Sequence, residues 1–133
     1  YFGGRAEVTS FAVADDALAG RHGAALEKLR WALSTGVSPV LVTSALASSL
    51  RGLGKYLELR SGSFSDQDLA RQVGVPAFKL KELNRFSRDW SGRGVSVAIR
   101  AVAKADEQVK GAAADPAFAL EQLLLRIAAA RSR

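Results

Sequence analysis

Apolar residues recur every three or four positions along most of the chain, which is the spacing of one face of an α-helix. The clearest stripe comprises Val42, Leu46, Leu50, Leu53 and Leu57, with Tyr56 at its edge. A second stripe comprises Val95, Ala98, Ile99, Val102 and Val109. No segment alternates apolar and polar residues over six positions, so strands are not expected. The pattern predicts an all-α fold, a single bundle of about six or seven helices.

Capping residues and glycines divide this pattern into seven expected helices. The expected ranges are 10–19, 23–35, 38–60, 65–74, 76–90, 91–110 and 115–131. Ser10, Ser38, Ser65, Ser91 and Asp115 are the expected N-caps. Residues 1–9 contain Gly3-Gly4 and have no periodicity. We therefore expect a tail or linker remnant over residues 1–9, followed by one helical domain over residues 10–133.

The composition removes several kinds of site. The chain of 133 residues has no cysteine and one histidine, His22, so thiolate or His-rich metal sites and disulfides are not expected. Its apolar runs are shorter than a membrane span, and the composition fits a cytoplasmic protein. Methionine is absent even at position 1, which predicts a piece of a longer chain. The net charge of +6 favours an acidic or nucleic-acid partner only weakly.

Two predicted helices carry more apolar surface than one core requires. In 23–35 the core side is Leu26, Leu29 and Leu33, and Trp31 projects roughly opposite. In 115–131 one side carries Leu120, Leu123, Leu124 and Ile127. Such a helix is either central in the bundle or covered by another chain, and the sequence leaves both readings open. The candidate subunit contacts are Trp31, Phe118, Leu125 and Ala129.

Residues 65–89 are typical of a helix-turn-helix. Small Ala70 precedes Gly74 in the turn, and Leu80 and Leu83 face back toward the first helix. Three basic residues fall on the outer face, where phosphates could be met: Lys81, Arg85 and Arg88. Against base reading, the second helix starts with Pro76, Ala77 and Phe78, which cannot form bidentate base contacts.

No motif predicts catalysis. Asp106 lies near the apolar seam of 91–110, and we expect a structural ion pair with Lys110 or with an arginine of another helix. His22 is expected at the solvent-exposed start of a helix, and the serines have no histidine partner. No phosphate-binding loop is present. Trp90 shares a side with Leu83 and is expected in the core. Catalytic, cofactor and metal residues are therefore predicted to be absent.

Segments in a fixed order along residues 10–131 resemble the C-terminal, or collar, domain of the δ subunit of bacterial DNA polymerase III, a clamp-loader family. They include SFAVADDALAG, LARQVGVPAFKLKELNRFSR, AIRAVAKADEQVKG and DPAFALEQLLLRIA. Single marks within them and between them are Gly20, Gly36, Pro39, Arg51, Lys79 and Asp106. No one mark is specific, and the resemblance rests on their order and spacing.

The resemblance implies a non-catalytic assembly role in DNA replication. In that family such domains pack side by side into a ring, the collar, that holds the loader together. The implied partners are the other loader subunits, of the δ′ and γ/τ types. The sliding clamp would be contacted only by an N-terminal region upstream of this chain. The alternative function from the residues themselves is a DNA-binding helix-turn-helix over 65–89, with DNA as the partner.

Overall fold

The computed structural model describes residues 4–111 and 115–132, and within them the chain forms helices and turns without any strand. The α-helices are α1 (Arg5–Leu18), α2 (His22–Ser34), α3 (Pro39–Leu59), α4 (Asp66–Val73), α5 (Leu80–Ser87), α6 (Gly92–Lys110) and α7 (Pro116–Arg131), and a 3-10 turn, η1 (Ala77–Lys79), precedes α5. The all-α fold predicted from the apolar spacing is confirmed.

Local capping explains several of the helix ends. The Ser65 hydroxyl accepts from the Asp68 amide at 3.2 Å, and the Ser91 hydroxyl accepts from the Gly94 amide at 3.0 Å. The Asp115 carboxylate accepts from the first amides of α7. Three turns use left-handed backbone, which favours glycine: φ is 84° at Gly20, 92° at Gly36 and 89° at Gly74.

The first helix begins earlier than the sequence predicted. Residues 5–9, expected to belong to a tail, form the first turns of α1, with Gly4 as the N-cap. Ser10 does not cap the helix: it is fully buried, and its hydroxyl donates to the Ala6 carbonyl at 2.8 Å. The hydroxyl is thus satisfied inside a helix, which a capping rule cannot anticipate. Residues 1–3 lie outside the described residues.

The expected helix over 76–90 is shorter and less regular. After Pro76 the chain makes the η1 turn, and the α-helical part ends at Ser87. Trp90 lies beyond the helix end, yet it is buried as predicted, and its indole Nε1 donates to the Leu18 carbonyl at 2.9 Å.

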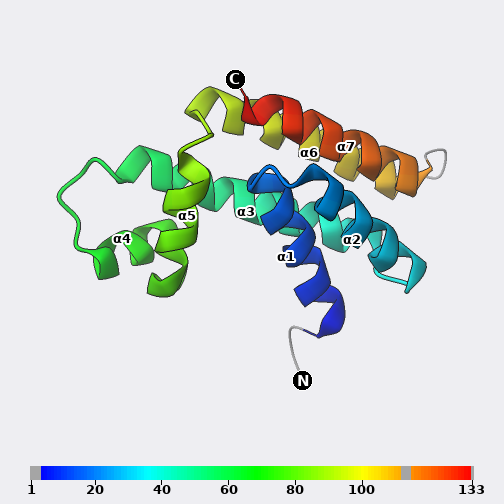
Figure 1. The fold of residues 1–133 in the computed structure, drawn as a ribbon, viewed down its shortest axis with the longest axis horizontal. Coiled ribbons are helices and arrows are strands. Elements are labelled where there is room, and N and C mark those ends of the chain that lie inside the picture. The colour runs from blue at the N-terminus through cyan, green and yellow to red at the C-terminus, as the bar shows by residue number, and fades with distance from the viewer. Residues whose placement is uncertain (1–3, 112–114, 133) are drawn as a thin grey trace.

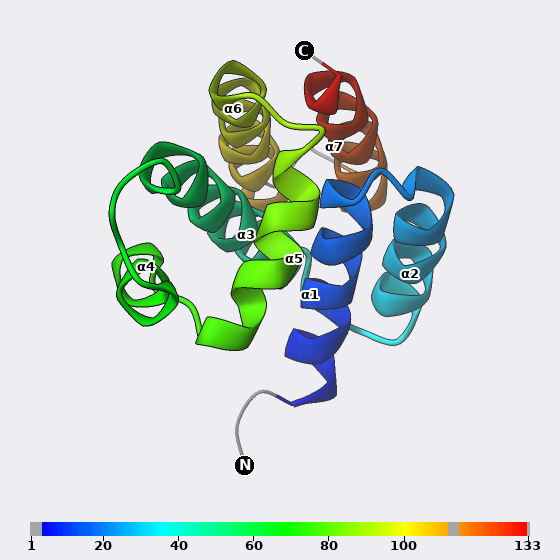
Figure 2. The same cartoon turned by 60° about the vertical axis from the view of Figure 1, so that its left-hand side comes forward.

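The long helix α3 is the centre of the bundle. It packs on one side against α6 and on another against α1, and both α4 and α5 lie against it near its C-terminal end. Figure 1 shows α6 and α7 side by side along one long edge of the molecule, with α4 and α5 gathered at one end. Helix α2 packs against α1 and α7. Figure 2 shows α5 and α1 running next to each other in front of α3.

Buried side chains from all seven helices form one core. The stripes predicted on α3 and α6 are largely buried, with Leu57, Ile99 and Val109 at their margins. The core side of α2 differs from the prediction. Leu29 is fully buried with Ala25 and Ala32, whereas Leu26 and Leu33 are only partly buried. Small alanines let α2 approach α1 closely, which moves the larger leucines to the margin.

Candidate functional site

Helix α7 has an exposed apolar face in addition to its core face. Its buried side contains the predicted core residues Leu120, Leu123, Leu124 and Ile127. On the opposite side Phe118 is 63% exposed and Leu125 is 56% exposed, and Ala129 is exposed one turn further on. We call Phe118, Leu125 and Ala129 the α7 patch. The reading of α7 as a fully central helix is therefore wrong for this chain taken alone.

Trp31 lies on a different part of the surface. It is exposed on α2, where it shares a shallow hollow with residues at the start of α1, including Arg5 and Thr9. The neighbouring Arg30 points to α7 instead, and its guanidinium binds both oxygens of Glu121 at 3.1 Å. Hydrogen bonds from Arg30 hold the pKa of Glu121 below its usual value. The four predicted contact residues therefore lie on two separate parts of the surface, with Trp31 on one and the three residues of the α7 patch on the other.

The three predicted phosphate contacts lie together on α5 and at its C-cap, Arg88. Lys81, Arg85 and Arg88 follow one another at spacings of four and three, so they share a face, and all three are exposed. None of them forms an ion pair with another residue in the described ranges. Phe78 in η1 is also exposed. The turn at Gly74 and the buried Leu80 and Leu83 agree with the helix-turn-helix pattern, although both helices pack chiefly against α3.

Asp106 has the structural partners that its position predicted. Lys110 Nζ lies 2.6 Å from one carboxylate oxygen, and the Thr43 hydroxyl donates to the other at 2.7 Å. Hydrogen bonds from Lys110 and Thr43 hold the pKa of Asp106 below its usual value. The ionised carboxylate on α6 thus connects that helix to α3 through its hydrogen bond with Thr43. The expected pairing with Lys110 is confirmed.

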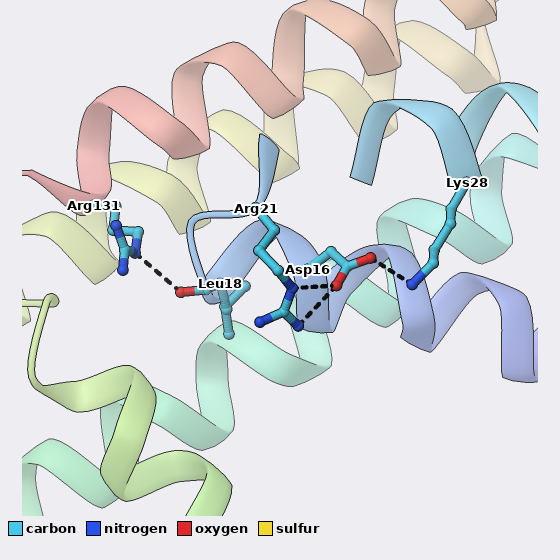
Figure 3. Close-up of polar contacts among 5 residues, drawn as sticks. All are labelled: Asp16, Leu18, Arg21, Lys28 and Arg131. Carbon is cyan, nitrogen blue, oxygen red and sulfur yellow. Dashed lines mark hydrogen bonds and ion pairs between the residues drawn. The ribbon is translucent and has the colours of Figure 1, made fainter. Parts of the chain in front are cut away.

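Sequence reasoning missed a second and more deeply buried carboxylate, Asp16. Its side chain is only 5% exposed at the corner between α1 and α2. Arg21 Nε donates to one oxygen at 2.8 Å and Lys28 Nζ to the other at 2.6 Å, as Figure 3 shows. Burial alone would raise the pKa of Asp16, but the hydrogen bonds from Lys28 and Arg21 outweigh it and lower the pKa. The available signal was that Asp16 falls on the apolar side of α1.

The same corner is tied to the C-terminal end of α7. In Figure 3, Arg131 approaches the end of α1, where its Nε donates to the Leu18 carbonyl at 3.3 Å. The guanidinium also binds Asp89 at 2.8 Å. One arginine thus connects α7, α1 and the segment after α5. These contacts are structural, and they fix the relative positions of the exposed surfaces.

Within residues 4–111 and 115–132, no group of three or more His, Asp or Glu side chains is arranged to hold a metal ion. His22, the first residue of α2, is partly exposed. In the same part of the chain, no helix has the length and apolarity to cross a membrane. The features that distinguish this surface are therefore its apolar patches, a basic face and, as described below, a groove.

Comparison with known proteins gives the class of the fold first. The chain is similar to a solved structure of the Bacillus subtilis DNA clamp loader delta protein, YqeN, with a TM-score of 0.78 and 17% sequence identity. The match covers 93% of this chain and 37% of that chain. At this identity the likeness shows the fold alone, an all-helical domain like the matched part of that protein. No curated protein matches the sequence.

The family follows from the sequence match. Residues 7–127 match the family described as DNA polymerase III delta subunit, C-terminal domain. The chain belongs to this family, and it is related to the clamp loader δ protein. The resemblance inferred from the order of segments is confirmed.

Proposed function

We propose that this chain is a non-catalytic assembly domain of the DNA polymerase III clamp loader, in which it packs against the other loader subunits in the collar. The partners are subunits of the δ′ and γ/τ types, and the work is done in the cytoplasm during DNA replication. Contact with the sliding clamp belongs to the N-terminal region of the δ subunit, outside this chain. The observation that carries the proposal is the exposed α7 patch on a helix whose other side is core.

The energetics support a stable contact at this patch. Phe118 and Leu125 are each more than half exposed, so their burial against a neighbour contributes about 1–2 kcal/mol each. Aromatic side chains are favoured as anchors of interfaces, which gives Trp31 a similar role on the other side of α2. Two separate apolar patches suit a subunit that has a neighbour on each side, as a ring requires.

The test is complex formation with the collar domains of the partner subunits, followed by size-exclusion chromatography with light scattering. We expect the wild-type chain to form a larger species and the double substitution Phe118→Ser, Leu125→Ser to lose it. Phe64→Ser is the matched control, because Phe64 is also an exposed apolar residue but lies in the segment between α3 and α4. Persistent monomers in every mixture would contradict the proposal, and so would equal loss in the control.

A second candidate function is DNA binding by α5. It is favoured by the shared exposed face of Lys81, Arg85 and Arg88, none of them paired within the described residues. If these residues contact phosphates, log affinity falls with log salt concentration, and replacing all three with alanine reduces the magnitude of this negative slope by about 3. The control is the triple alanine variant of Arg93, Arg100 and Lys104, which lie on one face of α6. Absence of duplex binding at low salt would remove this function.

A further inference from the structure

A long apolar groove runs between α1 and α5 and is not part of the surfaces described above. Its cavity volume is about 590 Å³. One wall is a stripe of α1 that includes Val8, Phe11 and Leu18, and the other is formed by α5 and the turn before it, including Leu83 and Phe86. Figure 2 shows these two helices side by side with α3 behind them.

The groove exists because the residues of α3 behind it are small. The positions that line it from α3 are Ser48, Ser49 and Gly52. A Cβ added at Gly52 would meet nothing within 4 Å, so packing inside this chain does not require a glycine there. A glycine inside a helix costs about 1 kcal/mol relative to alanine. Gly52 therefore makes α3 less stable at the position where a larger side chain would fill the groove.

The rim of the groove is acidic although the chain as a whole is basic. Three carboxylates line it, Glu7, Asp15 and Glu82, against one lysine, Lys79, whose Nζ lies 3.5 Å from Glu82. Asp15 forms no ion pair or side-chain hydrogen bond with another described residue. Burial, followed by the negative charge of Glu82, raises the pKa of Asp15, and the positive charges of Lys79 and Arg21 only partly offset these effects. A cation placed between these two carboxylates would relieve that unfavourable charge.

We infer that this groove binds a basic amphipathic helix of a partner protein, with its apolar face against Phe11 and Phe86 and a lysine or arginine at Asp15 and Glu82. From Glu7 to Leu18 the α1 wall is about 16 Å long, which matches three turns of a bound helix. Helices present no free backbone edge, so an extended peptide would gain no main-chain hydrogen bonds here. Nucleic acid is disfavoured because its phosphates would face the carboxylates.

The test uses two synthetic, fluorescently labelled helical peptides of about four turns. One carries leucine on one face and lysine on the other, and the second has glutamate in place of each lysine. We expect fluorescence anisotropy to show the lysine peptide binding at least about tenfold more tightly, against the net charge of the chain. Amide NMR shifts should concentrate on α1 and α5. Equal or tighter binding of the glutamate peptide would overturn the inference.

Substitutions in the groove provide the decisive comparison. Gly52→Leu fills the groove from its floor and should weaken binding of the lysine peptide at least about tenfold. Gly23→Leu is the matched control, because a Cβ added at Gly23 also meets nothing within 4 Å, but Gly23 lies on α2, outside the groove. Unchanged binding in Gly52→Leu, or equal loss in both variants, would overturn the inference.

Charge variants keep the inference testable should Gly52→Leu fold poorly. The double variant Asp15→Asn, Glu82→Gln should lose most of the preference for lysine over glutamate, whereas Glu107→Gln on the exposed side of α6 should keep it. Retained preference in the double variant would count against a cation site. The chain could instead self-associate through the groove, in which case the peptide would displace the second copy and Gly52→Leu would abolish the association. That result would identify a second copy as the occupant and would also overturn the inference. Failure of this binding leaves the collar proposal untouched, since the α7 patch lies elsewhere.

Discussion

Replacing Asp16 with asparagine tests how the corner between α1 and α2 is stabilised. Asparagine has almost the same shape, so no cavity forms, and the change removes the negative charge that holds Arg21 and Lys28 at 2.8 and 2.6 Å. A hydrogen bond to a charged group contributes about 1.5–3 kcal/mol. Both cations remain largely exposed and can be solvated after the change, which reduces the loss. We expect Asp16→Asn to lower the free energy of unfolding by about 1.5–3 kcal/mol.

The expected loss depends on pH in a defined direction. The folded-state pKa of Asp16 lies below its unfolded value, because the hydrogen bonds from Lys28 and Arg21 outweigh burial. Its stabilising contribution is therefore present above the unfolded pKa of about 3.9 and is lost as the pH falls through the folded pKa. The difference between wild type and Asp16→Asn should be greatest near neutral pH and should shrink in acid.

The assay is urea unfolding followed by far-UV circular dichroism at several pH values. In thermal melts the same loss corresponds to a decrease in Tm of about 5–10 °C. Asp106→Asn is the matched control, since that carboxylate is 29% exposed and its loss should cost less than about 1 kcal/mol. A loss for Asp16→Asn no larger than for Asp106→Asn, or one that does not change between neutral and acidic pH, would refute the reasoning.

Three further predictions concern packing and charge. Gly94→Ala should lower the free energy of unfolding by at least about 2 kcal/mol, because its Cβ would lie 2.5 Å from the Ala130 carbonyl oxygen. Gly52→Ala, whose Cβ would meet nothing within 4 Å, should raise the free energy of unfolding by up to about 1 kcal/mol, and urea unfolding compares the two variants. Leu123→Ala, at a site 1% exposed, should cost about 2–5 kcal/mol in the same measurement, and a smaller cost would place Leu123 outside the core. Asp15→Asn should leave the free energy of unfolding at neutral pH unchanged or raise it. The folded-state pKa of Asp15 is raised, so the stability that its protonated form contributes is lost as the pH rises through that pKa, and the charged form has nothing to lose on substitution. Clear destabilisation by Asp15→Asn would contradict this.

The sequence by itself determined the fold class and most of the helix ends. Caps such as Ser65, Ser91 and Asp115 and the left-handed glycines act over a few neighbouring residues, so the interactions that end a helix are written next to one another in the chain. The spacing of apolar residues likewise identified the core side of α7 and its second apolar side. The order of segments was sufficient to identify the family.

The tertiary structure decided what depends on which helices meet. It showed that Ala25 and Ala32 rather than the flanking leucines occupy the centre of the α2 contact, and that Ser10 lies within α1. It also separated Trp31 from the α7 patch and opened a groove in front of Gly52. Burial is a property of the space left between neighbours. The spacing along one helix gives the direction of each side chain, but only the packed bundle determines whether another helix fills the volume in front of it.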